Sequence, residues 1–193
     1  MALSLVTGPS LEPVTLTEAK LHCRVDGSTE DALITDLIIA ATRAAERFTH
    51  RRFISQVWDD KRDAAPGCVW ESPTAPVISI DSVSYVDTNG STQTWSSALY
   101  LTDIPAGPTA APARLTPIYG GVWPLTRDVL NAFTVRFTAG YGATAASVPY
   151  DIKAAIKLLV GHLYTNREPV QIGGNVTDIP MTVAALLWPY KSF

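Results

Sequence analysis

Charged side chains are scarce in this chain of 193 residues: they make up 17% of it, below the ~25% of ordinary domains. The apolar fraction of 47% is ample for a packed core, which argues against disorder. A large core explains the shortage of charge, and a second explanation is that part of the surface is covered in an assembly. The net charge is −3 and no run of Lys or Arg is present, so we expect no non-specific affinity for nucleic acid.

Cysteines and long apolar runs are also few. Cys23 and Cys68 are the only two cysteines, and they form neither a CxxC pair nor a Cys/His cluster. A disulfide framework and a zinc site are therefore disfavoured, and we expect two reduced thiols. No stretch approaches the ~18 apolar residues of a membrane span. The N-terminus lacks the pattern of a signal peptide, so we expect folding in a cytosol without membrane contact.

Motifs that carry chemistry are missing as well. His22, His50 and His162 share no metal-ligand spacing, and structural roles are expected for them. Asp59 and Asp60 occupy adjacent positions of a predicted strand, so their side chains point to opposite faces and cannot form a simple dyad. No P-loop, GxGxxG or GxSxG pattern occurs. We therefore predict that the protein is not an enzyme and has no cofactor-binding, catalytic or metal site.

Helical periodicity is confined to the two ends of the chain. A capping box formed by Thr15 and Glu18 begins the first helix, and Pro149 begins the third. The four predicted helices cover residues 16–23, 29–50, 149–166 and 181–188.

The helix over 29–50 has the clearest pattern, with two neighbouring apolar rows. The first row is Leu33, Leu37, Ala41, Ala44 and Phe48. The second row is Ile34, Ile38, Ala41 and Ala45. We expect core packing first, with Arg43, Glu46 and Arg47 on the wet side. Because the face is wider than one neighbour needs, Ile38, Ala41 and Ala45 are candidates for a contact between subunits.

Between about residues 53 and 140 the period changes to the alternation of strands. Asn89-Gly90 is the strongest hairpin signal in the chain. The predicted strands lie at 53–58, 69–70, 77–86, 92–95, 100–101, 114–117 and 133–138. The fold class is therefore α+β: a small helical bundle built from residues 1–52 and 147–193, with an inserted antiparallel β domain at 53–146.

The C-terminal segment carries the candidate for a partner contact. A long loop over 167–180 has Gly173 and Gly174 as its hinge, and long loops are usually functional or mobile. A short last helix needs a partner surface, and Trp and Tyr often anchor interfaces. The interface candidates are Leu187, Trp188, Tyr190 and Phe193. The alternative is that these side chains fold back onto the bundle.

Three sets of residues, taken in order, form a recognisable signature over nearly the whole chain. The first runs through 13–20, 24–26, 31–34 and 44–49 (PVTLTEAK, RVD, DALI and AAERFT). The second is 137–142 and 148–156 (FTAGYG and VPYDIKAAI). The third is 162–168 (HLYTNRE) with the ending Ala184, Leu186, Leu187, Pro189 and Tyr190. The chain resembles the head–tail connector (adaptor) family of long-tailed bacteriophages, also found in prophages and gene-transfer agents.

This resemblance implies a structural virion protein at the head–tail junction, assembled in the cytoplasm of a bacterial host. It implies a ring of identical subunits, a dodecamer in the particle, beneath the portal protein. The ring joins the head to a stopper or tail-completion protein and lines the channel through which DNA leaves without specific binding. The C-terminal candidates would contact the portal. The block 53–146 departs from the smallest, nearly all-helical members of the family.

Two alternatives stay open at this stage. The first is another head-completion or tail-completion protein, such as a stopper, although those are typically richer in β-structure. The second is a ligand- or carbohydrate-binding module in the β block, where Trp58, Trp70, Trp95 and Trp123 are abundant. That second reading requires a concave pocket with convergent polar groups.

Overall fold

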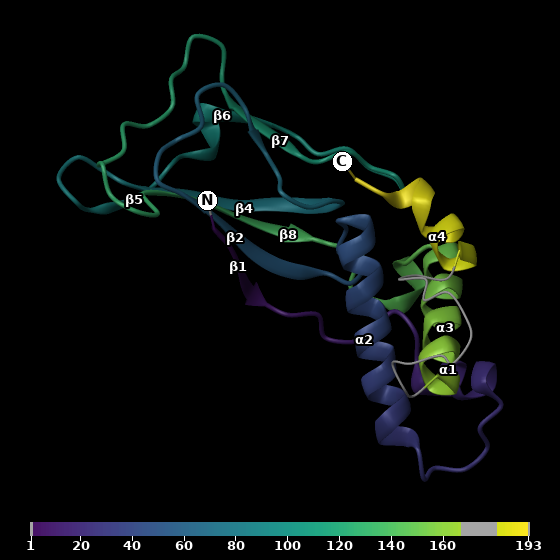
Figure 1. Cartoon of the computed structure of the whole chain (residues 1–193). Coiled ribbons are helices and arrows are strands. Elements are labelled where there is room, and N and C mark those ends of the chain that lie inside the picture. Colours follow the sequence, from purple (N-terminus) through teal and green to yellow (C-terminus); the bar gives the residue numbers. More distant parts are fainter. Residues whose placement is uncertain (1, 167–180, 193) are drawn as a thin grey trace.

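Figure 1 shows the computed structural model of the protein, which describes residues 2–166 and 181–192. Helices gather at one end of the molecule and strands project from them to the other end. Both ends of the chain contribute to the helical part, so the predicted α+β class is confirmed. The division into 1–52 with 147–193 and 53–146 remains a proposal.

Four α-helices form the helical part, in positions close to those predicted. They are α1 (Leu16–Cys23), α2 (Asp31–Thr49), α3 (Tyr150–Thr165) and α4 (Met181–Leu187). The predicted capping box is present: the Glu18 N–H donates to Thr15 Oγ1 over 3.2 Å, and the Thr15 N–H donates to Glu18 Oε2 over 2.8 Å. α3 packs against the other three helices and is the centre of this part.

The strands form two antiparallel sheets. The larger has the order β1-β2-β8-β4-β5, and the smaller has the order β3-β7-β6. Their bounds are β1 (Ala2–Thr7), β2 (Gln56–Arg62), β3 (Trp70–Glu71), β4 (Val77–Val86), β5 (Thr92–Thr94), β6 (Tyr100–Asp103), β7 (Arg114–Pro117) and β8 (Phe133–Ala139). In the predicted division, residues 2–7 belong to the helical bundle, whereas β1 pairs with β2 and so belongs to the larger sheet.

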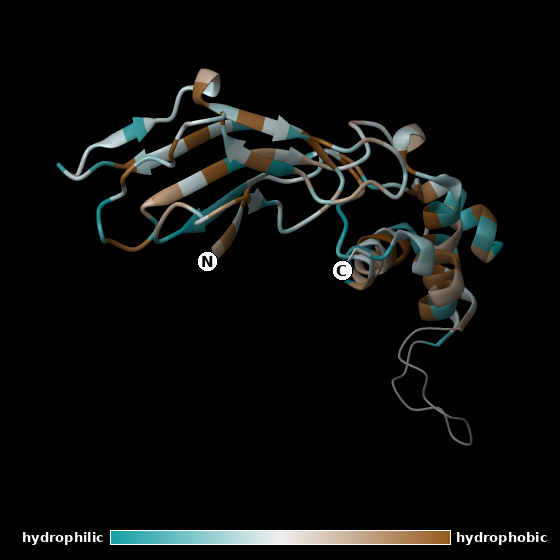
Figure 2. Cartoon of the chain, turned by 90° about the horizontal axis from the view of Figure 1, so that it is seen from above, coloured by the Kyte–Doolittle hydropathy of each residue, from teal (hydrophilic) through white to brown (hydrophobic). Residues whose placement is uncertain are grey.

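Each part has its own hydrophobic core. Ile34, Ile152 and Ile156 are fully buried among the helices. Between the two sheets, Trp70 packs edge-on against Phe137, with ring centroids 5.7 Å apart, and Leu115 lies in the same cluster. Figure 2, viewed from above, shows the β part extending away from the helices.

Two short 3₁₀ turns also bear on the sites described below, Ala145–Ser147 before α3 and Trp188–Tyr190 after α4. The Asn89-Gly90 hairpin joins β4 to β5 as predicted, and Gly90 has a φ of 90°. The first strand of the β part, in contrast, begins three residues later than the predicted range 53–58.

The delayed start of β2 follows from the joint between the two parts. Phe53 and Ile54 are buried in the helical core and do not enter the sheet. The Phe53 N–H donates to Glu46 Oε1 over 2.9 Å, and the Gln56 side-chain amide donates to the same oxygen over 3.2 Å. Glu46, expected on the wet side of its helix, is buried with 2% exposure.

Two cations face the second oxygen of the Glu46 carboxylate. Arg43 Nη1 lies 3.3 Å and Arg52 Nη1 lies 3.6 Å from Glu46 Oε2. Arg52 also lies over the Trp58 ring, 4.7 Å from its centroid. Burial of a carboxylate is tolerated only where hydrogen bonds and opposite charges compensate its lost hydration, and Glu46 has both.

The opposite wall of the joint is formed by the end of β8. A Cβ atom at Gly140 would meet the Ile54 carbonyl carbon at 2.6 Å, and the backbone there has a φ of 136°. The Tyr141 N–H donates to the Phe53 carbonyl over 2.9 Å, and the two rings stack with centroids 6.5 Å apart. Only glycine at position 140 allows this close approach of the two backbones.

Replacing Glu46 with alanine should destabilise the protein strongly. The buried Phe53 N–H and the half-buried Arg52 would lose their partner, and the loss of one partner of a buried charge costs about 3–5 kcal/mol in similar cases. Chemical denaturation measures the loss. Arg43→Ala is the matched control, because that side chain is 41% exposed and its ion pair should contribute at most about 1 kcal/mol. Equal small losses for both variants would contradict the role of Glu46.

Candidate assembly surfaces

The C-terminal segment folds back onto the helical part. Leu187 is fully buried in the core and Tyr190 is nearly so. The Tyr190 hydroxyl donates to Asp151 Oδ2 over 2.9 Å, and Arg51 Nε donates to the Tyr190 carbonyl. Desolvation by burial, and then the Asp151 carboxylate, raise the pKa of the Tyr190 hydroxyl. These contacts correspond to the alternative arrangement that the sequence left open.

Trp188 behaves differently from its neighbours in this segment. Its side chain is 59% exposed, whereas Leu187 and Tyr190 on either side point inward. Lys191 lies 5.3 Å from the Trp188 ring centroid and the same distance from that of Phe48. Of the three predicted contact residues that the structure describes, only Trp188 therefore offers a large apolar surface. Phe193, like the hinge pair Gly173 and Gly174, lies outside the described residues.

The subunit-contact candidates on α2 face the interior. Ile38, Ala41 and Ala45 are at most 3% exposed, because their row of the helix belongs to the helical core. In this structure they present no surface to another subunit. The buried row also includes three polar residues, of which Glu46 was expected on the wet side of the helix. Its members are Ile34, Ile38, Ala41, Thr42, Ala45, Glu46 and Thr49. The other predicted row lies at the rim, where Leu33 is exposed and Leu37 is half-buried.

A second exposed apolar surface lies on the connection between β7 and β8, residues 118–130. Trp123 holds this loop: its Nε1 donates to the Cys68 carbonyl over 3.2 Å, and its ring lies against Trp95 and Phe133. Four apolar side chains of the loop are more than four-fifths exposed. They are Tyr119, Val122, Leu125 and Leu130. Periodicity does not mark this loop, because it belongs to no helix or strand.

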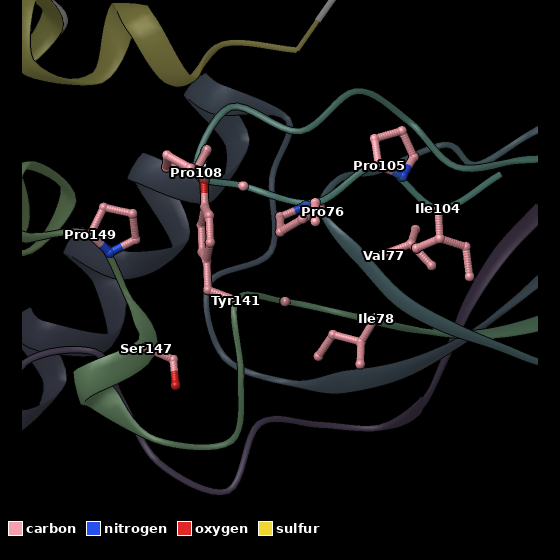
Figure 3. Close-up of a pocket in the computed structure, with 12 residues that line it drawn as sticks. Pro76, Val77, Ile78, Ile104, Pro105, Pro108, Tyr141, Ser147 and Pro149 are labelled. Atoms are coloured by element: carbon pink, nitrogen blue, oxygen red, sulfur yellow. Dashed lines mark hydrogen bonds between the residues drawn. The ribbon is translucent and has the colours of Figure 1, made fainter.

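A cavity of about 630 Å³ lies between the end of β8 and the loop that follows β6 (Figure 3). Proline and aliphatic residues line most of it, and Tyr141 and Ser147 supply its only polar side chains. The Tyr141 hydroxyl donates to the Pro108 carbonyl over 2.7 Å, and burial raises its pKa to about 12. Ser147 Oγ lies 3.2 Å from Thr144 Oγ1. No polar groups converge on the cavity, as a specific small-molecule site would require.

The adjacent carboxylates Asp59 and Asp60 have separate partners in the structure. Asp59 forms a two-pronged ion pair with Arg136 across the β2–β8 ladder, with N–O distances of 2.8 and 3.0 Å. Asp60 points to the other face and accepts from Trp70 Nε1 over 2.7 Å, as the strand period predicts. Within residues 2–166 and 181–192, no three His, Cys, Asp or Glu side chains gather as a metal site needs. Among the helices of these residues, none has the length and apolar character of a membrane span.

Comparison with known proteins defines the class of this fold. The family model of the phage gp6-like head-tail connector protein matches residues 13–94. No curated protein sequence matches the chain. The fold of the whole chain also matches those of chains in solved structures.

The particular proteins that it is similar to come from gene transfer agent (GTA) particles. A chain from the neck of an empty GTA particle, computed with C6 symmetry, has a TM-score of 0.83 and 25% identity; the match covers 100% of this chain and 96% of that one. A chain from the virion of a native GTA particle has a TM-score of 0.81 at 24% identity, with the same coverage. A chain from the neck of a native GTA particle, computed with C12 symmetry, has a TM-score of 0.74 at 23% identity, also with that coverage. The last two show the fold, and the resemblance to head–tail connector proteins is confirmed.

The two neighbours Leu187 and Trp188 should differ sharply in their effect on stability. Leu187→Ala should lower the free energy of unfolding by about 2–5 kcal/mol, because it removes a fully buried side chain. Trp188→Ala should cost less than about 1 kcal/mol, because the side chain is mostly in water. Denaturation of the full chain measures both. A large loss for Trp188→Ala would place that ring in the core.

Proposed function

We propose that this chain is a structural subunit of the neck of a tailed phage or gene transfer agent. In this role it forms a ring adaptor between the portal of the head and the tail. The observation that carries the proposal is the match over the full length of the chain to a neck protein of a GTA particle, at 25% identity and a TM-score of 0.83. The match of residues 13–94 to the head-tail connector family supports it independently.

The necks that contain similar chains have C6 and C12 symmetry, which supports a ring of copies of this chain, with twelve as the expected number. A closed ring needs two different contact surfaces on each subunit. In the proposed arrangement, Trp188 contacts the portal. The surface at the other end of the subunit, with the 118–130 loop, contacts a stopper or tail-completion protein.

The role is mechanical and requires no catalysis. DNA passes through the ring, and a net charge of −3 disfavours tight binding to it. The β part weakens the alternative of a ligand- or carbohydrate-binding module. Trp70 and Trp95 are buried, and Trp58 and Trp123 are half-buried. None of these four rings is therefore fully exposed for stacking on a ligand. The stopper alternative is weakened by the extent of the helical part.

Disruption of the gene in cells that make the particles tests the proposal. Filled heads and complete tails should accumulate separately, and the wild-type gene supplied in trans should restore joined particles. Electron microscopy of the lysate counts the two classes. Joined particles in the absence of the chain would refute the adaptor role.

The portal contact is tested by complementation with Trp188→Ala. Joined particles should fall at least tenfold, because exposed Trp side chains frequently dominate interface energies. Met181→Ala is the matched control, since Met181 is also exposed on the same short segment. Equal numbers of joined particles from the two variants would mean that Trp188 does not contact the portal.

Duplex DNA should bind the purified chain only weakly. The expected dissociation constant at physiological salt is no tighter than ~10⁻⁶ M, the non-specific range, because no cluster of cations is present. A filter-binding titration at two salt concentrations measures it. Sub-micromolar affinity with a steep salt dependence would contradict a channel that releases DNA freely.

A further inference from the structure

The N-terminal strand β1 is unusually exposed for part of a sheet. It pairs with β2 along one edge only, and it is the last strand of the larger sheet. Five of its six residues are exposed, including Leu3 at 36%, Leu5 at 49% and Val6 at 43%. Alternate backbone N–H and C=O groups of such a strand point away from the sheet, ready to pair with another strand.

The side chains of β1 extend the core-facing surface of the sheet. Leu3 pairs with Asp60 and Leu5 pairs with Trp58, so both leucines share the face on which Asp60 binds Trp70 of the smaller sheet. Trp70 of the smaller sheet lies against Asp60 of β2, whereas Leu3 and Leu5, one strand farther out, are exposed. Leu3 and Leu5 thus form an apolar surface that the rest of the subunit does not cover.

β1 also lacks most of the features that protect exposed edges, and the one irregularity in its pairing lies near its end, between Leu5 and Thr7. Natural edge strands are short, charged or interrupted by proline. β5 has three polar residues, and β3 has two residues of which one is Glu71. β1 has six residues without charge or proline. Among the described strands, it is the edge best suited to receive a partner.

The chain itself offers a partner edge on the opposite side of the β part. β6 pairs with β7 along one edge only and is the last strand of the smaller sheet. Figure 1 shows β1 at the lower side of the β part and β6 at the upper side. Leu101 of β6 is 58% exposed, so this strand too carries an apolar side chain in water.

Geometry favours the same pairing. A contact between two different edges on opposite sides repeats in one direction from copy to copy, as a ring requires.

We propose that β1 of one copy pairs with β6 of the next copy, so that the sheets of neighbouring subunits join around the ring. The partner is a second copy of this chain, and the contact is main-chain hydrogen bonding with Leu3 and Leu5 buried beside it. This inference rests on the proposed ring and names its subunit contact.

Cysteine cross-linking in assembled particles tests the pairing. The background is the full chain with Cys23→Ser and Cys68→Ser, to which Leu5→Cys and Leu101→Cys are added. A short thiol-specific cross-linker should convert this double variant into a ladder of multimers on a denaturing gel. Each single-cysteine variant should remain monomeric.

Three other results of the cross-linking experiment can be distinguished from one another. Dimers from Leu5→Cys alone would mean that two β1 strands pair with each other, which overturns the proposal. Particles with a normal neck but no ladder would overturn it and leave the adaptor function intact. Absence of the chain from the neck would overturn the adaptor function and this contact with it.

A charge variant gives an independent readout. Leu3→Lys with Leu5→Lys places two cations on the proposed contact at positions that are at least one-third exposed, so folding should be retained. Complementation by this variant should reduce joined particles at least tenfold. Leu21→Lys with Met181→Lys, at positions that are 81% and 84% exposed, is the control of equal charge and should retain joining. Normal joining by the β1 variant would overturn the pairing.

Discussion

The arrangement of this protein depends on one buried carboxylate. Glu46, near the end of α2, accepts the Phe53 N–H and the Gln56 amide and faces Arg43 and Arg52. These contacts fix the turn that takes the chain from the helical part into β2. A buried carboxylate is stable only when its partners are in place. Because the partners of Glu46 lie on both sides of the turn, they hold the larger sheet in one orientation relative to the helices.

A fixed joint has consequences for the proposed role. In the proposed role a neck subunit holds the head at one end and the tail at the other. The two parts of this chain extend in different directions from the end of α2 (Figure 1). Gly140 tightens the joint from the other side, where β8 approaches Ile54 closely. The exposed surfaces, Trp188 near the helices and the 118–130 loop on the β part, are then held at defined positions relative to each other. Contacts between neighbouring sheets would extend this rigidity around the ring.

Much of the fold could be predicted from local sequence. The capping box at Thr15 marked the start of α1, and alternation marked β4 and β8, because these signals depend on neighbouring residues alone. The orientation of α2 could not be predicted, since it depends on partners far along the chain. From hydropathy, Glu46 was expected in solvent, but its distant partners bury it. Ala45 was expected at a contact between subunits, but it lies inside the helical core. The exposed surface at Leu5 could not be predicted for the same reason. Its exposure depends on how the sheets pack in three dimensions, which the spacing of residues in the sequence does not indicate.

The central claim is that this chain is a subunit of the particle neck. Its most direct test is a cryo-electron microscopy reconstruction of the neck from particles that contain it, at a resolution that identifies side chains. The account predicts a ring of this chain between portal and tail, with Trp188 toward the portal and the 118–130 loop toward the tail. Density for the chain in the head shell or tail tube alone, or a neck ring built from another protein, would contradict it.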